Sequence, residues 1–143
     1  MISTYDPNNI FAKILRGEAP CTKIYEDDVS LAFLDVMPRA DGHTLVVPKV
    51  AARNIFDVAA EDLARLMPAI QKVARAVMSG MAAEGLTIQQ FNEVAGGQQV
   101  FHLHFHVLPR WPGVALKPPG GPFQSAEALR PHADRIIAAL ARI

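Results

Sequence analysis

The segment from Phe101 to Pro109 carries three histidines at alternate positions, with apolar residues between them. Successive side chains of a β-strand point to opposite faces, so His102, His104 and His106 are predicted to share one face. At about 3.3 Å per residue, neighbouring imidazoles lie roughly 6–7 Å apart along such a strand. The pattern predicts a strand that packs on a core with one face and presents a row of titratable rings on the other.

Length and composition limit the class of protein. The 143 residues suit one domain over 1–143, half of them are hydrophobic, and 14 basic residues balance 14 acidic ones. This balance excludes a disordered chain and argues against extended nucleic acid as a partner. Cys21 is the only cysteine, so a reducing compartment is expected. The first residues lack a secretory-signal layout, and no apolar run approaches the ~20 residues of a membrane span. We expect a soluble cytoplasmic domain without membrane contact.

The order of predicted elements indicates an α+β domain. Apolar spacing and turn residues predict helices over 9–16, 61–83 and 125–143, and strands over 22–26, 30–35, 43–48, 86–92 and 101–109. Short links predict a five-stranded antiparallel sheet with helices on one face and the other face free for a ligand. Pro68 predicts an irregular start or a bend in the long helix, and Pro131 leaves the start of the last helix open. Five of the 11 prolines lie in 109–122, which is expected to be irregular and extended.

The chemistry of the histidine row leaves three interpretations open. Rings this close disfavour simultaneous protonation and share a small number of protons. A neutral ring with a fixed tautomer is a good nucleophile, and a ring that keeps its proton is a good acid. The histidines are therefore structural, ligands of a zinc ion, or the machinery of covalent phosphorus chemistry. Zinc sites more often combine two alternating histidines with a distant ligand, and no carboxylate flanks this row, so no metal is predicted.

The loop before the histidines favours the phosphorus chemistry. Gly96 and Gly97 permit close backbone approach and conformations closed to other residues. Backbone amides in such a loop can form an anion-binding concavity beside the histidines. Gln98 adds a neutral donor for a phosphate oxygen.

Together these segments resemble the histidine triad (HIT) superfamily of nucleotide hydrolases and transferases. HLHFHVLP matches its His-x-His-x-His signature, and the likeness runs from about Asn9 to Trp111, with 112–143 as a C-terminal extension. The first half is most similar to the histidine-triad nucleotide-binding branch. The other matching segments are IFAKILRGEAP, YEDD, AFLDVMP, GHTLVVPK and GGQQV. The resemblance implies a HIT-like sheet with a long helix and an N-terminal helix, here with a C-terminal helix added.

The resemblance also implies roles for individual residues. His104 is implied to be the nucleophile that attacks the α-phosphorus and forms a nucleotidyl-histidine. His102 and His43 are implied to orient it, and His106 to contact the phosphate and assist the leaving group. Asp35 is implied to accept hydrogen bonds from the ribose hydroxyls. The polar positions implied to line the phosphate pocket are Asn92, Gln98 and Gln99. The mechanism requires no metal or other cofactor.

Three features depart from the family pattern. Ala51 stands where a PK-x-His pattern has its histidine, and Glu93 stands where glycine is frequent. Zinc-binding members carry an N-terminal cysteine pair, which residues 8–11 lack, so no structural zinc is predicted. Glu93 puts the conformation of its loop, and with it the role of Asn92, in question.

These observations predict a hydrolase that cleaves nucleoside phosphoramidates or dinucleoside polyphosphates at the α-phosphorus. Histidine rather than glutamine at position 106 favours hydrolysis over transfer to a sugar phosphate. We expect a purine nucleotide as substrate and a homodimer as the assembly. The alternatives are a non-catalytic nucleotide-binding or interaction protein and a zinc hydrolase that uses the three histidines. Phe11, Ile24 and Phe33 are expected either to wall the base pocket or to belong to the core.

Overall fold

The computed structural model describes residues 4–143, so the first three residues of the predicted domain lie outside the described part. A five-stranded sheet occupies its centre, in the order β1-β2-β3-β5-β4, with antiparallel neighbours. The elements are α1 (Ile10–Leu15), β1 (Lys23–Glu26), β2 (Ser30–Leu34), β3 (Thr44–Pro48), α2 (Ala60–Gly80), β4 (Gly85–Gln89), the short 3-10 helix η1 (Val94–Gly96), β5 (Phe105–Arg110) and α3 (Ala126–Leu140). The predicted α+β class and antiparallel five-stranded sheet are confirmed.

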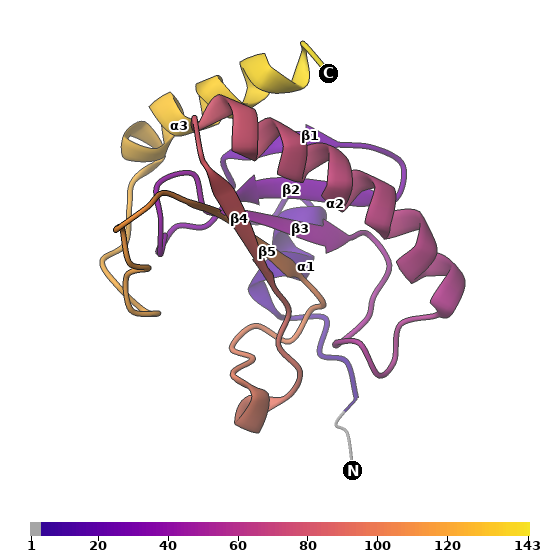
Figure 1. Cartoon of the computed structure of the whole chain (residues 1–143). Coiled ribbons are helices and arrows are strands. Elements are labelled where there is room, and N and C mark those ends of the chain that lie inside the picture. The colour runs from indigo at the N-terminus through magenta and orange to yellow at the C-terminus, as the bar shows by residue number, and fades with distance from the viewer. Residues whose placement is uncertain (1–3) are drawn as a thin grey trace.

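The long helix α2 and the C-terminal helix α3 lie together on one side of the sheet (Figure 1). Their apolar residues pack on one face of β2, β3 and β5, and the fully buried members of this cluster include Leu66, Ile70, Val73, Val77, Ala32, Val46, Val107 and Ile136. α2 continues through Pro68, which removes the donor for the carbonyl of Ala64. Both residues are exposed, so water can replace the missing hydrogen bond. Ser125 begins α3 by accepting a hydrogen bond from the Ala128 amide, and Pro131 lies within the helix.

The opposite face of the sheet also carries a helix, so the expectation that helices cover only one face is wrong. Phe11 of α1 packs there on alternate positions of β2 and β3, namely Leu31, Phe33, Leu45 and Val47. Every residue of these two strands is buried, as their nearly unbroken apolar runs require when both faces are covered. Because α1 is short, it covers this face only in part and leaves the start of β5 beside it.

The histidine segment is only partly a strand. β5 begins at Phe105, so His102 and His104 precede it, which corrects the predicted strand over 101–109. The cause lies in a competing hydrogen bond, because the amide of Leu103 donates to the carbonyl of Ala52 at 2.8 Å instead of joining the sheet. Leu103 and Val107 are fully buried, whereas the histidine rings gather on the α1 side.

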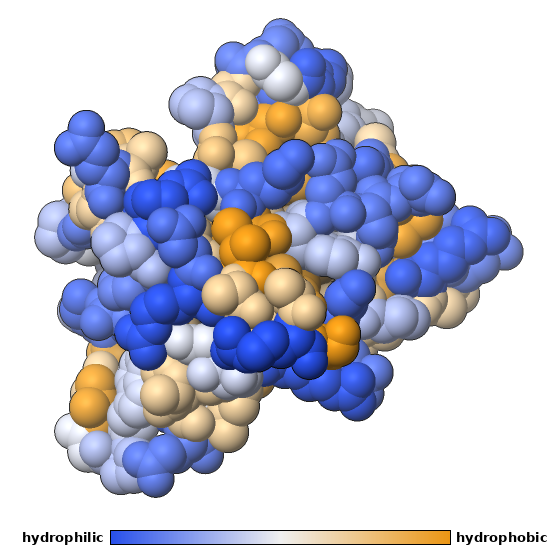
Figure 2. Space-filling view, turned by 90° about the horizontal axis from the view of Figure 1, so that it is seen from above, coloured by the Kyte–Doolittle hydropathy of each residue, from blue (hydrophilic) through white to orange (hydrophobic). Residues whose placement is uncertain are grey.

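The C-terminal extension lies against the body of the domain. The amide of Lys117 donates to the carbonyl of Arg39, and that of Gln124 donates to the carbonyl of Val36. α3 then approaches α2 so closely at Gly80 that an added Cβ would lie 2.8 Å from the carbonyl oxygen of Arg135. Seen from above, on the side of α3, the surface is mostly hydrophilic with scattered apolar areas (Figure 2). Among residues 4–143 no helix combines the length and apolarity needed to cross a bilayer.

Candidate active site

The candidate site lies where the start of β5, the loop before β3 and the helix α1 meet. The ring centroids of His104 and His106 are 4.9 Å apart, and those of His43 and His106 are 5.1 Å apart. Phe11 stands edge-on to His104 at 4.9 Å, with an angle of 88° between the rings. Strand and loop therefore bring together His43, His104 and His106, which the sequence analysis assigned to one site.

The backbone determines which nitrogen of His104 carries a proton. Nδ1 lies 2.7 Å from the carbonyl oxygen of His102, and a carbonyl can only accept. Nδ1 of His104 must therefore be the protonated nitrogen, and Nε2 keeps its lone pair. His104 is 7% exposed and His106 is partly exposed, so the rings lie at the edge of the core rather than inside it. This is the protonation pattern that a nitrogen nucleophile needs.

The same reasoning gives His106 the opposite pattern. The amide of Arg39 donates to Nδ1 of His43 at 3.1 Å, so the proton of His43 resides on Nε2. Nε2 of His43 lies 2.9 Å from Nδ1 of His106 and donates to it. Nε2 of His106 therefore carries the remaining proton. This chain of hydrogen bonds leaves His106 with a donor at Nε2, beside the lone pair on Nε2 of His104.

His102 is a structural support for its neighbours. Its Nε2 donates to the carbonyl of Pro48 at 2.8 Å, and its Nδ1 accepts from the hydroxyl of Tyr5 at 2.6 Å. Both ring nitrogens are thus occupied, while the carbonyl of the same residue orients His104. Sequence reasoning missed Tyr5, because a lone aromatic residue 97 positions away carries no signal of this contact.

The histidine rings are neutral at physiological pH. Burial lowers the pKa of His43 and of His106 to about 3, and repulsion from the neighbouring rings and from Arg39 adds to the effect. Burial likewise lowers the pKa of His104 to about 4 and shifts the pKa of His102 downwards. Neutral rings have the lone pairs and single donors that the hydrogen bonds above assign to them.

Asp35, at the end of β2, completes the polar side of the site. One of its oxygens accepts from the amide of Met37 at 2.8 Å, and the other lies 3.5 Å from Nε2 of His43. Burial raises the pKa of this carboxyl above its usual value, although its side chain remains 18% exposed. A carboxylate oxygen is therefore present at the rim, as the predicted ribose contact requires.

The geometry also bears on metal binding. One ligand atom each from Asp35, His43 and His106 lies within 4.8 Å of the others. However, the Arg39 amide keeps the proton of His43 on Nε2, the nitrogen that would face an ion, so this nitrogen has no free lone pair. The three-histidine zinc interpretation meets a similar obstacle, because both nitrogens of His102 are engaged. The hydrogen bonds suit proton handling better than ligation.

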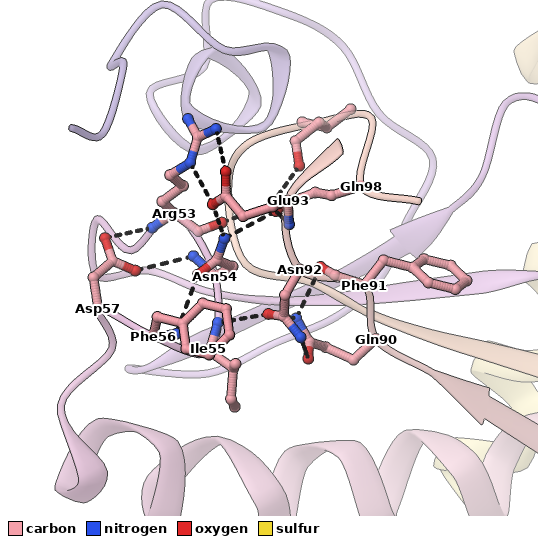
Figure 3. Close-up of polar contacts among 11 residues, drawn as sticks. Arg53, Asn54, Ile55, Phe56, Asp57, Gln90, Phe91, Asn92, Glu93 and Gln98 are labelled. Atoms are coloured by element: carbon pink, nitrogen blue, oxygen red, sulfur yellow. Dashed lines mark hydrogen bonds and ion pairs between the residues drawn. The ribbon is translucent and has the colours of Figure 1, made fainter. Parts of the chain in front are cut away.

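The loop before the histidines is held by a network of side chains (Figure 3). Glu93 forms a two-pronged ion pair with Arg53, from Nε at 2.8 Å and from Nη2 at 3.0 Å. Asn54 donates to both Glu93 and Gln98. Glu93 adopts φ +66°, where glycine is favoured, and Gly97 adopts φ +96°. The ion pair anchors the very residue that departs from the family pattern.

Gln98 lies inside this network rather than facing the histidines. Its oxygen accepts from Asn54 and from the Glu93 amide, and its nitrogen donates to the carbonyls of Arg53 and Val100. Every polar atom of this side chain has a partner within the loop. The structure therefore gives Gln98 a supporting position. The amides of Gly96 and Gly97 also donate within the loop, to the carbonyls of Glu93 and Val94, so the predicted anion-binding concavity of free amides is wrong at these two positions.

The remaining predicted residues divide between the loop and the core. Asn92 accepts from the Ile55 amide and exchanges hydrogen bonds with Gln90, whereas Gln99 is exposed (Figure 3). Phe33 packs with Phe11 on the face that carries the histidines. Ile24 belongs to the cluster under α2 and α3, on the other face, so it cannot wall the same pocket.

Known proteins resemble this chain in sequence and in fold. Residues 16–113 match the family model described as HIT domain. A solved Hit-like protein from Bartonella henselae, involved in cell-cycle regulation, superposes with a TM-score of 0.91 at 47% identity, over 96% of this chain and 99% of that one. The adenosine 5'-monophosphoramidase hnt1 of Schizosaccharomyces pombe is 35% identical over 76% of this chain and 86% of its own length. The adenylylsulfatase HINT3 of Arabidopsis thaliana is 33% identical over 76% of this chain and 55% of its own length.

Proposed function

Because this chain belongs to the HIT domain family, we propose that it hydrolyses nucleotides at the α-phosphorus through a covalent nucleotidyl-His104. The substrates we infer are nucleoside phosphoramidates or dinucleoside polyphosphates with a purine base. The observation that carries the proposal is the unequal protonation of two adjacent rings. Nε2 of His104 has a lone pair, and Nε2 of His106 has a proton, although the side chains are chemically identical.

In the first step, Nε2 of His104 attacks the α-phosphorus and forms a P–N bond. The bond between phosphorus and the leaving group breaks, and its electron pair departs with the leaving group. His106 donates its Nε2 proton where an amine leaves, because an amide anion is too basic to depart unprotonated. In the second step, water attacks the phosphorus and the P–N bond to His104 breaks, with its electron pair returning to Nε2. Where an amine has left, the proton lost by the water restores the Nε2–H of His106, and the nucleoside monophosphate is released.

Fixed groups around the rings support this chemistry. The His102 carbonyl stabilises the positive charge that develops on the His104 ring, since Nδ1–H already donates to it. Asp35 offers an acceptor for the ribose hydroxyls at the rim of the site. Holding the nucleophile in one orientation lowers the activation barrier of such a reaction, by at most about 7–11 kcal/mol.

The direct test replaces His104 by alanine. The H104A variant should lose turnover of adenosine 5'-phosphoramidate while it still binds AMP in calorimetry. Mass spectrometry of wild-type protein quenched during turnover should detect an adenylylated peptide that contains position 104. The matched control is H132A on α3, outside the site, which should keep wild-type activity. Wild-type rates in H104A would refute the nucleophile assignment, and tight AMP binding with negligible turnover of all substrates by the wild type would favour a binding protein.

The assembly we propose is a homodimer. β4 is an edge strand that pairs with β5 on one side, and Ile88 on it is 48% exposed. An edge strand with an exposed apolar residue favours pairing with another chain. Light scattering coupled to size-exclusion chromatography tests this, and a monomer at micromolar concentration would contradict it.

A further inference from the structure

A cavity lies at the far end of β5 from the histidines, on the side of the C-terminal extension. Its volume is about 270 Å³, and it opens between the loop after β2, the end of β5 and the extension. Three cationic side chains line it, namely Arg39, Arg110 and Lys117, against one acidic residue, Asp41. Within residues 4–143 no carboxylate forms an ion pair with any of the three. In a chain with no net charge, this cavity is a local excess of positive charge.

Arg39 connects this cavity with the catalytic rings. Its Nε donates to the carbonyl of Lys117 at 2.8 Å, and its Nη1 lies 3.5 Å from the side-chain oxygen of Gln89. Gln89 of β4 is the direct cross-strand partner of His106, and directly paired residues point to the same face. The guanidinium therefore reaches from the extension to the neighbourhood of His106, the ring that faces the leaving group in the proposed mechanism.

The electrostatics agree with this placement. Burial is the main cause of the low pKa of His106, and the positive charge of Arg39 lowers it further. The contacts with Lys117 and Gln89 use Nε and Nη1, so the guanidinium still has N–H groups to offer a ligand. The planar guanidinium group binds pairs of oxygens on anions such as carboxylate and phosphate with charge-assisted hydrogen bonds.

We propose that Arg39, with Lys117 and Arg110, forms a subsite that binds an anionic leaving group and makes the enzyme prefer such substrates. This inference rests on the proposed function and specifies its substrate class: nucleotides whose α-phosphorus is joined to an oxyanion, sulfate or phosphate, rather than to an amine. The extension contributes both a cation and the carbonyl that orients Arg39, so it takes part in specificity.

The two leaving groups differ in the proton that they need. With adenosine 5'-phosphosulfate, His104 forms the P–N bond, the bond from phosphorus to the bridging oxygen breaks, and sulfate leaves with the electron pair. Sulfate is a weak base, so it departs without a proton, and Arg39 stabilises its charge. With adenosine 5'-phosphoramidate, the P–N bond to nitrogen breaks, and ammonia departs with the proton of His106. Removing Arg39 should therefore affect the first reaction and spare the second.

The experiment compares kcat/KM of R39Q and wild type on adenosine 5'-phosphosulfate, diadenosine triphosphate and adenosine 5'-phosphoramidate, with AMP release as the common readout. Loss of a charge-assisted hydrogen bond should reduce kcat/KM for an oxyanion leaving group by about 10- to 100-fold. The phosphoramidate rate should change by less than about threefold, because no leaving-group charge is lost. The larger loss of kcat/KM identifies the leaving group that the subsite prefers: sulfate if adenosine 5'-phosphosulfate is affected more, and phosphate if diadenosine triphosphate is. R39K should restore part of the loss, and R75Q on the exposed side of α2 is the matched control.

Equal losses on all three substrates would overturn the subsite and assign the Arg39 side chain to holding its loop through Lys117 and Gln89. Unchanged kinetics in R39Q would overturn it as well. Binding provides a readout independent of turnover: H104A protein should bind adenosine 5'-phosphosulfate more tightly than AMP, and R39Q/H104A should lose that difference. If the wild type hydrolyses none of the substrates, the proposed function fails, whereas the binding comparison still decides the subsite.

Discussion

Buried neutral histidines make the stability of this protein sensitive to mild acid. The unfolded chain exposes its imidazoles, which take up protons below about pH 6.5. In the folded protein, burial keeps the pKa of His43 and of His106 at about 3 and that of His104 at about 4. Between these limits unfolding binds protons, so the free energy of unfolding falls as the pH falls from 6.5 towards 4.

The magnitude follows from the three shifts. At pH 5 each unfolded ring carries nearly a full proton and each folded ring is still neutral, which costs about 2 kcal/mol per ring relative to pH 7. The three rings together cost about 6 kcal/mol, comparable with the whole stability of a typical domain, about 5–15 kcal/mol. Asp35 offsets part of this loss, because burial raises its pKa and its folded form takes up a proton first.

Urea unfolding followed by circular dichroism at several pH values between 7 and 5 measures this slope. Replacing His106 by asparagine should reduce the slope by up to about 1.4 kcal/mol per pH unit. The matched control is V73A, a buried position in α2 that lowers stability at every pH and leaves the slope unchanged. Equal slopes in wild type and H106N would refute the assignment of a buried, neutral ring at position 106.

Two further predictions concern the supports of the site. Y5F removes the donor to Nδ1 of His102, so stability should fall by about 1 kcal/mol and the acid limb of kcat/KM should move to higher pH; superimposable pH–rate profiles would contradict this role. E93A keeps a side chain at φ +66° and breaks the pair with Arg53, whereas E93G breaks the pair but relieves the backbone. KM for adenosine 5'-phosphoramidate should rise roughly tenfold in E93A and less in E93G, because a shifted loop displaces the groups that hold the substrate. Equal KM values in the two variants would show that backbone strain at position 93 has no effect on binding.

The sheet and the central histidines could be predicted because their signals are local. Each strand is predicted by alternation or by an apolar run between turn residues, and short links predict that β1, β2 and β3 are antiparallel neighbours. The place of β5 between β3 and β4 does not follow from short links, because α2 lies between β3 and β4 in the chain. The position of α1 on the opposite face could also have been predicted. All residues of β2 and β3 are buried, which requires that another element covers each face of these strands. The prediction of helices on one face was wrong because it assumed that these strands are buried on one face only.

Contacts between distant segments account for what the sequence could not disclose. The bond from the Leu103 amide to Ala52 ends the strand early, and nothing in the histidine pattern indicates it. Gln98 follows the two glycines in the sequence, where a phosphate ligand is expected. Its side-chain oxygen instead accepts a hydrogen bond from Asn54, 44 positions earlier. The subsite at Arg39 depends on an extension contact across 78 positions.

The division of labour among the histidines is set by the backbone rather than by the histidine pattern. The carbonyl of His102 keeps the proton of His104 on Nδ1, and the amide of Arg39 keeps the proton of His43 on Nε2. The second of these fixed points also determines His106, whose Nδ1 accepts from His43 and whose proton therefore lies on Nε2. A substitution that displaced the His102 carbonyl or the Arg39 amide would therefore allow the proton of His104 or of His43 to move to the other ring nitrogen, with every histidine unchanged. The loop 35–43 therefore acts through one backbone group, because the Arg39 amide sets the tautomer of His43 and with it that of His106.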